Sequence, residues 1–281
     1  MIDIITEAVL DALKIVPFLF ITFLILEFLE HKLNKKTERV LLKYKKLGPV
    51  VGGLLGAIPQ CGFGAMAASL FSNKIITIGT VVAIFLSTSD EMLPIMLGHK
   101  ANLSTIFGIL GFKVLVGIVV GIIVDLLFRK KGYVKEHIHI NDMCEDEHCH
   151  CDDKGIFKSS IIHTLKIGGF ILLANLVINF IVFFVGEVQL AKILLNDNIF
   201  TYFISSAVGL IPNCVSSVVI TELYMNNLIS LGTMFAGLLT GSGLGILLLF
   251  KQNKNLKENI SVLSIIYFVG VVIGIIVDLV I

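Results

Sequence analysis

The stretch Ile58-Pro59-Gln60-Cys61 recurs in the second half of the chain as Ile211-Pro212-Asn213-Cys214, displaced by 153 positions. The same displacement relates the string Gly-Ile-Ile-Val-Asp at residues 121–125 to an identical copy at residues 274–278. Each motif interrupts an apolar run with a proline and a side-chain amide. In a membrane chain, matching interruptions in two halves indicate a transporter's substrate site. The sequence therefore predicts two structural repeats that meet at such a site.

The composition is typical of an integral membrane protein. Hydrophobic residues make up 56% of the 281 residues and charged residues only 15%, with a mean hydropathy of +0.94. A soluble domain carries about 25% charged residues, so we expect this chain to lie in a lipid bilayer. The formal net charge of +1 gives no basis for nucleic-acid binding, and we expect none.

The apolar runs predict an all-α polytopic fold, because a spanning helix needs about 20 mainly apolar residues. The runs at 49–72 and 202–225 contain the two motifs, and each can form one broken span or the two limbs of a re-entrant hairpin. About ten segments result, in a first repeat at 1–128, a linker at 129–160 and a second repeat at 161–281. Full-length span candidates cover about 8–29, 74–97, 104–128, 166–185, 228–250 and 259–280.

The charge of the loops favours inverted repeats. The loop at 32–46 holds seven Lys and Arg residues, whereas its counterpart at 186–200 holds only Lys192. Since cytoplasmic loops carry the excess of Lys and Arg, we expect equivalent loops on opposite sides of the membrane. Three spans and one hairpin per half satisfy this and place the basic central loop in the cytoplasm. We therefore expect a multi-pass protein of the cytoplasmic membrane.

Polar residues near the breaks are candidate substrate ligands, although a kinked helix with an incidental buried cysteine is the alternative at each motif. Residues 87–91, Ser-Thr-Ser-Asp-Glu, lie inside an apolar run, and the matching stretch 240–243 lacks both acids. Charges at membrane depth are costly and mark ion or proton routes. Asp90 or Glu91 is therefore expected to bind a cation, carry a coupling proton or pair with Lys113. The predicted substrate-binding residues are Pro59, Gln60, Cys61, Ser87, Thr88, Ser89, Asp90, Glu91, Pro212, Asn213, Cys214, Thr240 and Ser242.

A second cluster of ligand residues lies in the central loop. Four of the seven histidines and three of the five cysteines fall within residues 137–151. Imidazole and thiolate ligands suit zinc, copper or cadmium, so we predict a metal-capture or sensing segment. An acidic linker with incidental His and Cys is the alternative. The predicted metal ligands are His137, His139, Asp142, Cys144, His148, Cys149, His150 and Cys151.

These motifs resemble the ten-span heavy-metal exporters, a family also labelled as arsenic efflux proteins or manganese transporters. The resemblance covers essentially the whole chain. It rests on the paired Ile-Pro-Gln-Cys-Gly and Ile-Pro-Asn-Cys motifs, the Ser-Thr-Ser-Asp-Glu stretch and the central loop. It implies a membrane permease that exports a toxic metal or metalloid.

The residues and the resemblance together predict a secondary transporter that exports a heavy metal or metalloid by alternating access. Cys61 and Cys214 suit arsenite or antimonite, whereas the carboxylates and amides suit a divalent cation such as manganese. No bound cofactor is expected, because the metal ion is either the substrate or a ligand of the central loop. The expected partners are the bilayer, the transported ion and further copies of the chain in a homo-oligomer.

Two other functions remain open, and a third is not expected. A carrier of an organic or lipid anion would use the same kind of site, and a metal-responsive membrane scaffold would use the central loop alone. An enzyme is not expected, because the sequence contains no His-Glu-x-x-His pattern and its histidines fall at loops or span ends. The sequence also contains no Gly-rich loop ending in Gly-Lys-Ser or Gly-Lys-Thr, so we expect transport to be driven by an ion gradient, the membrane potential or a separate ATPase subunit.

Overall fold

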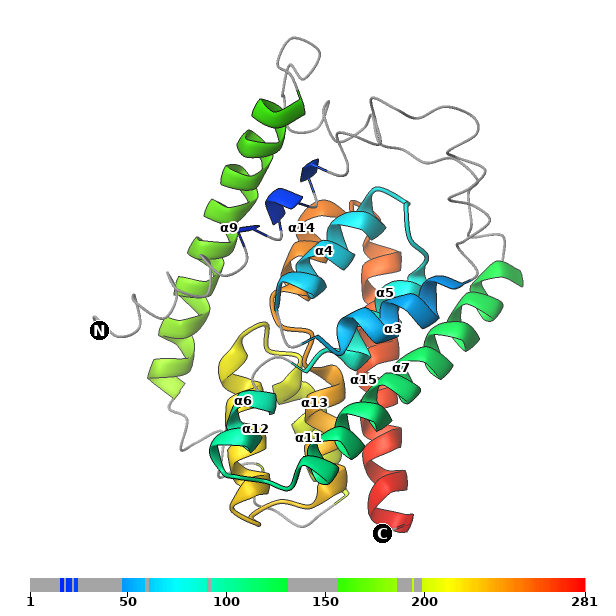
Figure 1. Ribbon diagram of the computed structural model, residues 1–281, viewed down its shortest axis with the longest axis vertical. Coiled ribbons are helices and arrows are strands. Elements are labelled where there is room, and N and C mark those ends of the chain that lie inside the picture. The colour runs from blue at the N-terminus through cyan, green and yellow to red at the C-terminus, as the bar shows by residue number, and fades with distance from the viewer. Residues whose placement is uncertain are drawn as a thin grey trace.

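The computed structural model describes residues 47–58, 61–89, 92–130, 156–185 and 199–280, together with residues 16, 17, 19–21, 23, 24 and 194. All regular secondary structure in these ranges is helical, which confirms the all-α polytopic prediction. Figure 1 shows the helices α3 (Gly48–Gly56), α4 (Cys61–Ser72), α5 (Ile78–Ser87), α6 (Met92–Gly98), α7 (Leu103–Lys130), α9 (Ile156–Val185), α11 (Phe200–Gly209), α12 (Cys214–Met225), α13 (Leu231–Thr240), α14 (Gly245–Gln252) and α15 (Leu256–Val280).

Four stretches of the described chain are long and apolar enough to cross a membrane. Two are the long helices α7 and α15. The other two are broken: Ile78–Gly98 contains α5 and α6, and Leu231–Gln252 contains α13 and α14. The broken spans are 69% and 83% buried, against 33% for α7 and for α15. The broken spans therefore form the centre of the bundle, and α7 and α15 lie at its periphery.

The helices repeat along the chain at the displacement of 153 seen in the sequence. Helices α4, α5, α6 and α7 begin at residues 61, 78, 92 and 103, and helices α12, α13, α14 and α15 begin at residues 214, 231, 245 and 256. Helix α7 ends at Lys130 and α9 begins at Ile156. Both helices therefore extend into the range 129–160 that the sequence assigned to the linker.

The contacts that join the helices repeat as well. The Asp125 carboxylate of α7 accepts hydrogen bonds from the Gly79 backbone N–H (2.8 Å) and from the Thr77 hydroxyl (2.7 Å) at the start of α5. In the second half, the Asp278 carboxylate accepts from the Gly232 N–H (2.7 Å) and from the Ser230 hydroxyl. A carboxylate stabilises the unpaired amides and the positive dipole of a helix N-terminus. The repeated Gly-Ile-Ile-Val-Asp string therefore holds a long helix against the start of a broken span.

One end of the bundle, which we call the Lys74 end, comprises residues 74–77, 125–130 and 253–258. Lys74, in the turn after α4, forms an ion pair with Glu258 at the start of α15. Thr77 follows in the same turn and contacts Asp125 near the end of α7. Helix α7 therefore ends where α15 begins.

The other end, which we call the His99 end, comprises residues 99–103, 222–230 and 278. His99, just after α6, lies 3.0 Å from the Glu222 carboxylate of α12 (Nε2 to Oε2). Ser230 follows α12 and contacts Asp278 near the end of α15. Helix α15 therefore ends where α7 begins, so the two long helices run in opposite directions (Figure 1).

Helices α3 and α4 form a hairpin that enters the bundle and returns to the end where it began, and so do α11 and α12. A Cβ atom on Gly48 would lie 2.2 Å from Thr80 Oγ1, and one on Gly56 would lie 2.1 Å from Ser87 Oγ, so α3 runs beside α5 in the same direction. Helix α4 then returns to Lys74 at the end where α3 began. In the second hairpin, the Ser205 hydroxyl of α11 donates to the Thr233 carbonyl (2.8 Å), and α12 returns to the His99 end. Of the two arrangements that the sequence left open, the structure has the hairpin.

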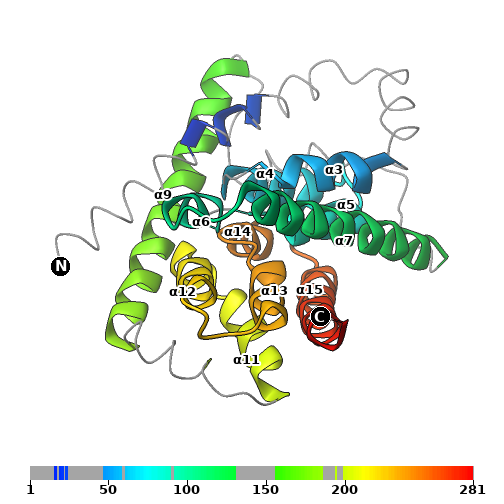
Figure 2. The ribbon, with the colours of Figure 1, turned by 60° about the horizontal axis from the view of Figure 1, so that its bottom comes forward.

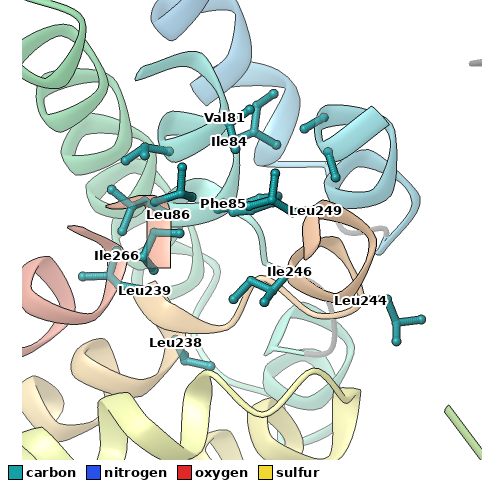
Figure 3. Packing of buried hydrophobic residues seen from close by; sticks show 14 of the residues in the cluster. Val81, Ile84, Phe85, Leu86, Leu238, Leu239, Leu244, Ile246, Leu249 and Ile266 are labelled. Atoms are coloured by element: carbon teal, nitrogen blue, oxygen red, sulfur yellow. The ribbon is translucent and has the colours of Figure 1, made fainter. Parts of the chain in front are cut away.

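The second helix of each hairpin packs against the second helix of the other repeat's broken span. Helix α4 lies against α14, and α12 lies against α6; both views show these pairs side by side (Figures 1 and 2). Between them, buried apolar side chains of α5, α13, α14 and α15 form the core, among them Phe85, Leu239, Leu249 and Ile266 (Figure 3).

Candidate transport site

A cavity lies where the breaks of the two halves meet. Its volume is about 10 Å³, close to the space that one water molecule requires. The walls come from both broken spans, from the start of α12 and from α7. The lining residues are Thr88, Ser89, Met92, Lys113, Asn213, Cys214, Ser216, Ser217, Leu238, Gly241 and Gly243.

The second Ile-Pro-Asn-Cys motif forms the tip of the α11–α12 hairpin. Asn213 is 3% exposed, and its side-chain oxygen lies 3.5 Å from the Val215 amide, so that it caps α12. Cys214, the first residue of α12, lines the cavity. The Ser217 hydroxyl, one turn further, donates to the Cys214 carbonyl (2.8 Å). The cavity wall thus includes an asparagine, a cysteine and the N-terminus of a helix, where the helix dipole is positive.

The Ser-Thr-Ser stretch lies at the break between α5 and α6, and only part of it reaches the cavity. Thr88 and Ser89 line the cavity. Ser87 and its repeat counterpart Thr240 do not; their hydroxyls donate to backbone carbonyls of their own helices, and that of Thr240 also donates to the Ser206 carbonyl of α11 (3.0 Å). Ser242 and Pro212 are also outside the lining, although Gly241 and Gly243 on either side of Ser242 belong to it.

Lys113 brings a positive charge to the cavity wall. It is 1% exposed and lies in α7. Its ammonium group donates to the Thr88 carbonyl, where α5 ends, and to the Leu238 carbonyl in the last turn of α13 (2.9 Å). The carbonyls in the last turn of a helix have no partner within the helix and carry its negative dipole end. Lys113 therefore joins the inner ends of two half-helices, one from each repeat.

Several predicted ligands lie outside the described residues. Pro59, Gln60, Asp90 and Glu91 are among them, as is the whole predicted metal-binding stretch from His137 to Cys151. Cys61 is described only as the first residue of α4. Their roles stay predictions. Among the described residues, no three His, Cys, Asp or Glu side chains are grouped as a metal site requires.

The cavity also contains residues that the sequence did not single out as ligands. Lys113 enters the sequence prediction only as a partner of Asp90 or Glu91, although a charged residue deep within an apolar span is itself an indication of function. Met92, Leu238 and the two glycines carried no chemical signal, because their place in the wall depends on how the half-helices cross.

Broken helices that end in mid-span around one cavity, with walls from both halves of the chain, are characteristic of membrane transporters. Comparison with known families agrees with this class. A model of the family described as "Putative, 10TM heavy-metal exporter" matches residues 1–201 and 165–281. The chain therefore belongs to this family, as the sequence motifs had indicated. No curated protein and no solved structure matches the chain.

Proposed function

We propose that the protein is a secondary transporter of the cytoplasmic membrane that exports a heavy-metal or metalloid ion by alternating access around the central cavity. The observation that carries this proposal is the shared wall of the cavity. Thr88 and Ser89 come from the first half, Asn213 and Cys214 come from the second, and each lies at a break in a helix. A site between two such halves can open to one side when the halves move relative to each other.

We also propose that the two halves are inverted repeats, with the Lys74 end in the cytoplasm. The opposite directions of α7 and α15 support the inversion. The positive-inside rule supports the orientation, because the exposed lysines Lys251, Lys254 and Lys257 lie at or next to the Lys74 end.

The topology can be tested with single cysteines at exposed positions, in a chain whose own cysteines are replaced by serine. An impermeant maleimide applied to intact cells should label Lys100→Cys and Asn227→Cys at the His99 end. It should label Lys254→Cys and Lys257→Cys only after the membrane is permeabilised. Labelling of both pairs from the same side would contradict the inverted arrangement.

The substrate can be identified by a growth screen in a metal-sensitive host. We expect the protein to raise resistance to at least one ion among arsenite, antimonite, manganese, zinc, cadmium and copper. Loss of resistance with Cys61→Ser/Cys214→Ser would indicate a thiol-bound metalloid or soft metal. Loss with Asp90→Asn/Glu91→Gln alone would indicate an oxygen-bound cation or proton coupling. No gain over the empty vector for any ion would contradict metal export.

The predicted metal-capture role of the central loop is tested in the same screen. Deletion of residues 137–153 should reduce resistance at low metal concentration, where capture of the metal limits its export. The deletion should not change which ion the protein confers resistance to. A deletion that has no effect at any concentration would show that the loop's His and Cys residues are incidental.

An organic or lipid anion is the second candidate substrate. Lys113 and the first residues of α12 both line the cavity, and a lysine side chain and a helix N-terminus both favour a negative charge. If no metal ion distinguishes the protein from the empty vector, transport of anions should be measured with the same variants.

A further inference from the structure

The two pairs of helices that the repeat relates are packed differently. Gly64 of α4 meets Gly245 of α14 closely: a Cβ atom on Gly245 would lie 3.0 Å from the carbonyl carbon and oxygen of Gly64. The repeat counterparts of these glycines are Ser217 of α12 and Met92 of α6, and both line the cavity. The α4–α14 contact is therefore closed at the level where the α6–α12 contact contains the cavity.

Three buried side-chain oxygens in the described residues have no hydrogen-bond partner, and all three lie on the α4–α14 side. They are Ser69 Oγ in α4, Ser242 Oγ just before α14, and Gln252 Oε1 in the last residue of α14. A buried polar group without a partner costs about 1–3 kcal/mol and requires an explanation.

The repeat provides that explanation, because each of these residues has a partly exposed or cavity-lining counterpart. Ser242 corresponds to Ser89, which lines the cavity. Ser69 and Gln252 correspond to Glu222 and His99, which face each other across the α6–α12 contact with side chains 44% and 34% exposed. The equivalent positions are therefore polar in both halves. At the α6–α12 contact they are partly exposed or line the cavity, whereas at the α4–α14 contact their side-chain oxygens are buried.

We propose that the α4–α14 contact is a closed gate, and that it opens into a hydrated path lined by Ser69, Ser242 and Gln252 that leads from the cavity to the Lys74 end. This inference rests on the proposed transport function and assigns its second access path. When this gate opens, the three unpaired oxygens gain water as partners. The α6–α12 contact then closes around Met92 and Ser217 in exchange.

The Lys74–Glu258 ion pair holds the gate at its outer end. Glu258 is 9% exposed and also accepts a hydrogen bond from the Asn253 side chain (3.1 Å) in the turn between α14 and α15. The pair therefore ties the turn after α4 to the start of α15, and the Asn253 hydrogen bond connects it to the end of α14. Removal of the ion pair should favour the open gate. His99 and Glu222 bridge α12 and α6 at the opposite end, and a change there serves as the matched control.

The gate can be tested by the rate at which a small charged methanethiosulfonate reagent modifies single cysteines. The full-length protein, with its own cysteines replaced by serine, is reconstituted with the Lys74 end accessible. Ser69→Cys and Ser242→Cys should react roughly tenfold or more faster than Ser205→Cys. Ser205 is the matched control because it is equally buried, at 0% exposure, but its hydroxyl is bonded between α11 and α13.

Adding Glu258→Gln should increase the reaction of Ser69→Cys further, whereas adding His99→Gln should not. Gel filtration of each variant excludes unfolding as the cause. Reaction of Ser69→Cys and Ser242→Cys as slow as that of Ser205→Cys, with and without Glu258→Gln, would overturn the proposal, because the contact would then be permanent packing. Since labelling does not depend on the cargo, a gate that opens in a protein that moves no metal would contradict the proposed substrate and not the gate.

Discussion

Gly121→Ala is expected to destabilise the protein by about 1–3 kcal/mol, the usual cost of forcing an extra methyl group into a packed interior. Gly121 of α7 crosses Gly79 of α5 at backbone contact. A Cβ atom on Gly121 would lie 2.5 Å from the Gly79 carbonyl oxygen, 2.9 Å from Ala83 Cβ and 3.0 Å from Pro49 Cβ. The first of these is backbone, so relief requires α7 to move away from α5. Close helix contact through small residues is a main source of association in membranes.

The matched control is Gly111→Ala in the same helix, where a Cβ atom would meet nothing within 4 Å. That variant should be neutral or slightly stabilising, because alanine favours helix over glycine by about 0.8–1 kcal/mol. Thermal unfolding in detergent, followed by gel filtration, measures both. Equal melting temperatures for the two variants would contradict the close crossing of α5 and α7. Gly274→Ala tests the repeat counterpart and should behave like Gly121→Ala.

Lys113→Met is expected to lower stability by about 2–4 kcal/mol, since it removes the donor from two buried carbonyls that then lack a partner. It should also abolish metal resistance, because the ammonium holds together the inner ends of α5 and α13, between which the cavity lies. The matched control is Ile266→Met at the repeat counterpart, which is 0% exposed and apolar. A volume-conserving swap of this kind usually costs less than about 1.5 kcal/mol.

Both variants are compared by thermal unfolding and by growth on the ion identified in the screen. Normal resistance with Lys113→Met would show that the lysine is dispensable for the cavity. Equal losses with Lys113→Met and Ile266→Met would show that this level of the bundle tolerates no change, whatever the charge.

Some of the repeated parts of the fold could be predicted from the sequence. The breaks inside 74–97 and 228–250 could not: the sequence predicts a full-length span in each range, and the structure divides each into two helices, α5 and α6 in the first and α13 and α14 in the second. Proline, an amide and cysteine at one place in each half predicted the two helix breaks, and Asn213 and Cys214 do lie at such a break on the cavity wall. The identical strings ending in Asp125 and Asp278 predicted equivalent structure, and their carboxylates cap equivalent helices. Such features depend on local sequence and on the register between the halves, and both can be read from the chain.

The differences between the halves could not be predicted, because they depend on packing. Ser217 and Met92 line a cavity while their counterparts Gly64 and Gly245 close a contact, and no local pattern distinguishes these outcomes. A hydroxyl in a polar stretch likewise gives no indication of its direction. Thr88 lines the cavity, whereas the hydroxyl of Thr240, at the end of α13, donates a hydrogen bond to the Ser206 carbonyl of α11.

The most direct test of the proposed function is the movement of metal ions into proteoliposomes that contain the purified protein. The wild type is compared with Ser217→Phe, whose bulky ring would block the cavity that Ser217 and Met92 both line. We predict that at least one ion of the screened panel crosses the membrane with the wild type, and that Ser217→Phe, shown to be folded by gel filtration, stops it. Equal movement through both proteins, or no movement of any ion with the wild type, would contradict export through the central cavity.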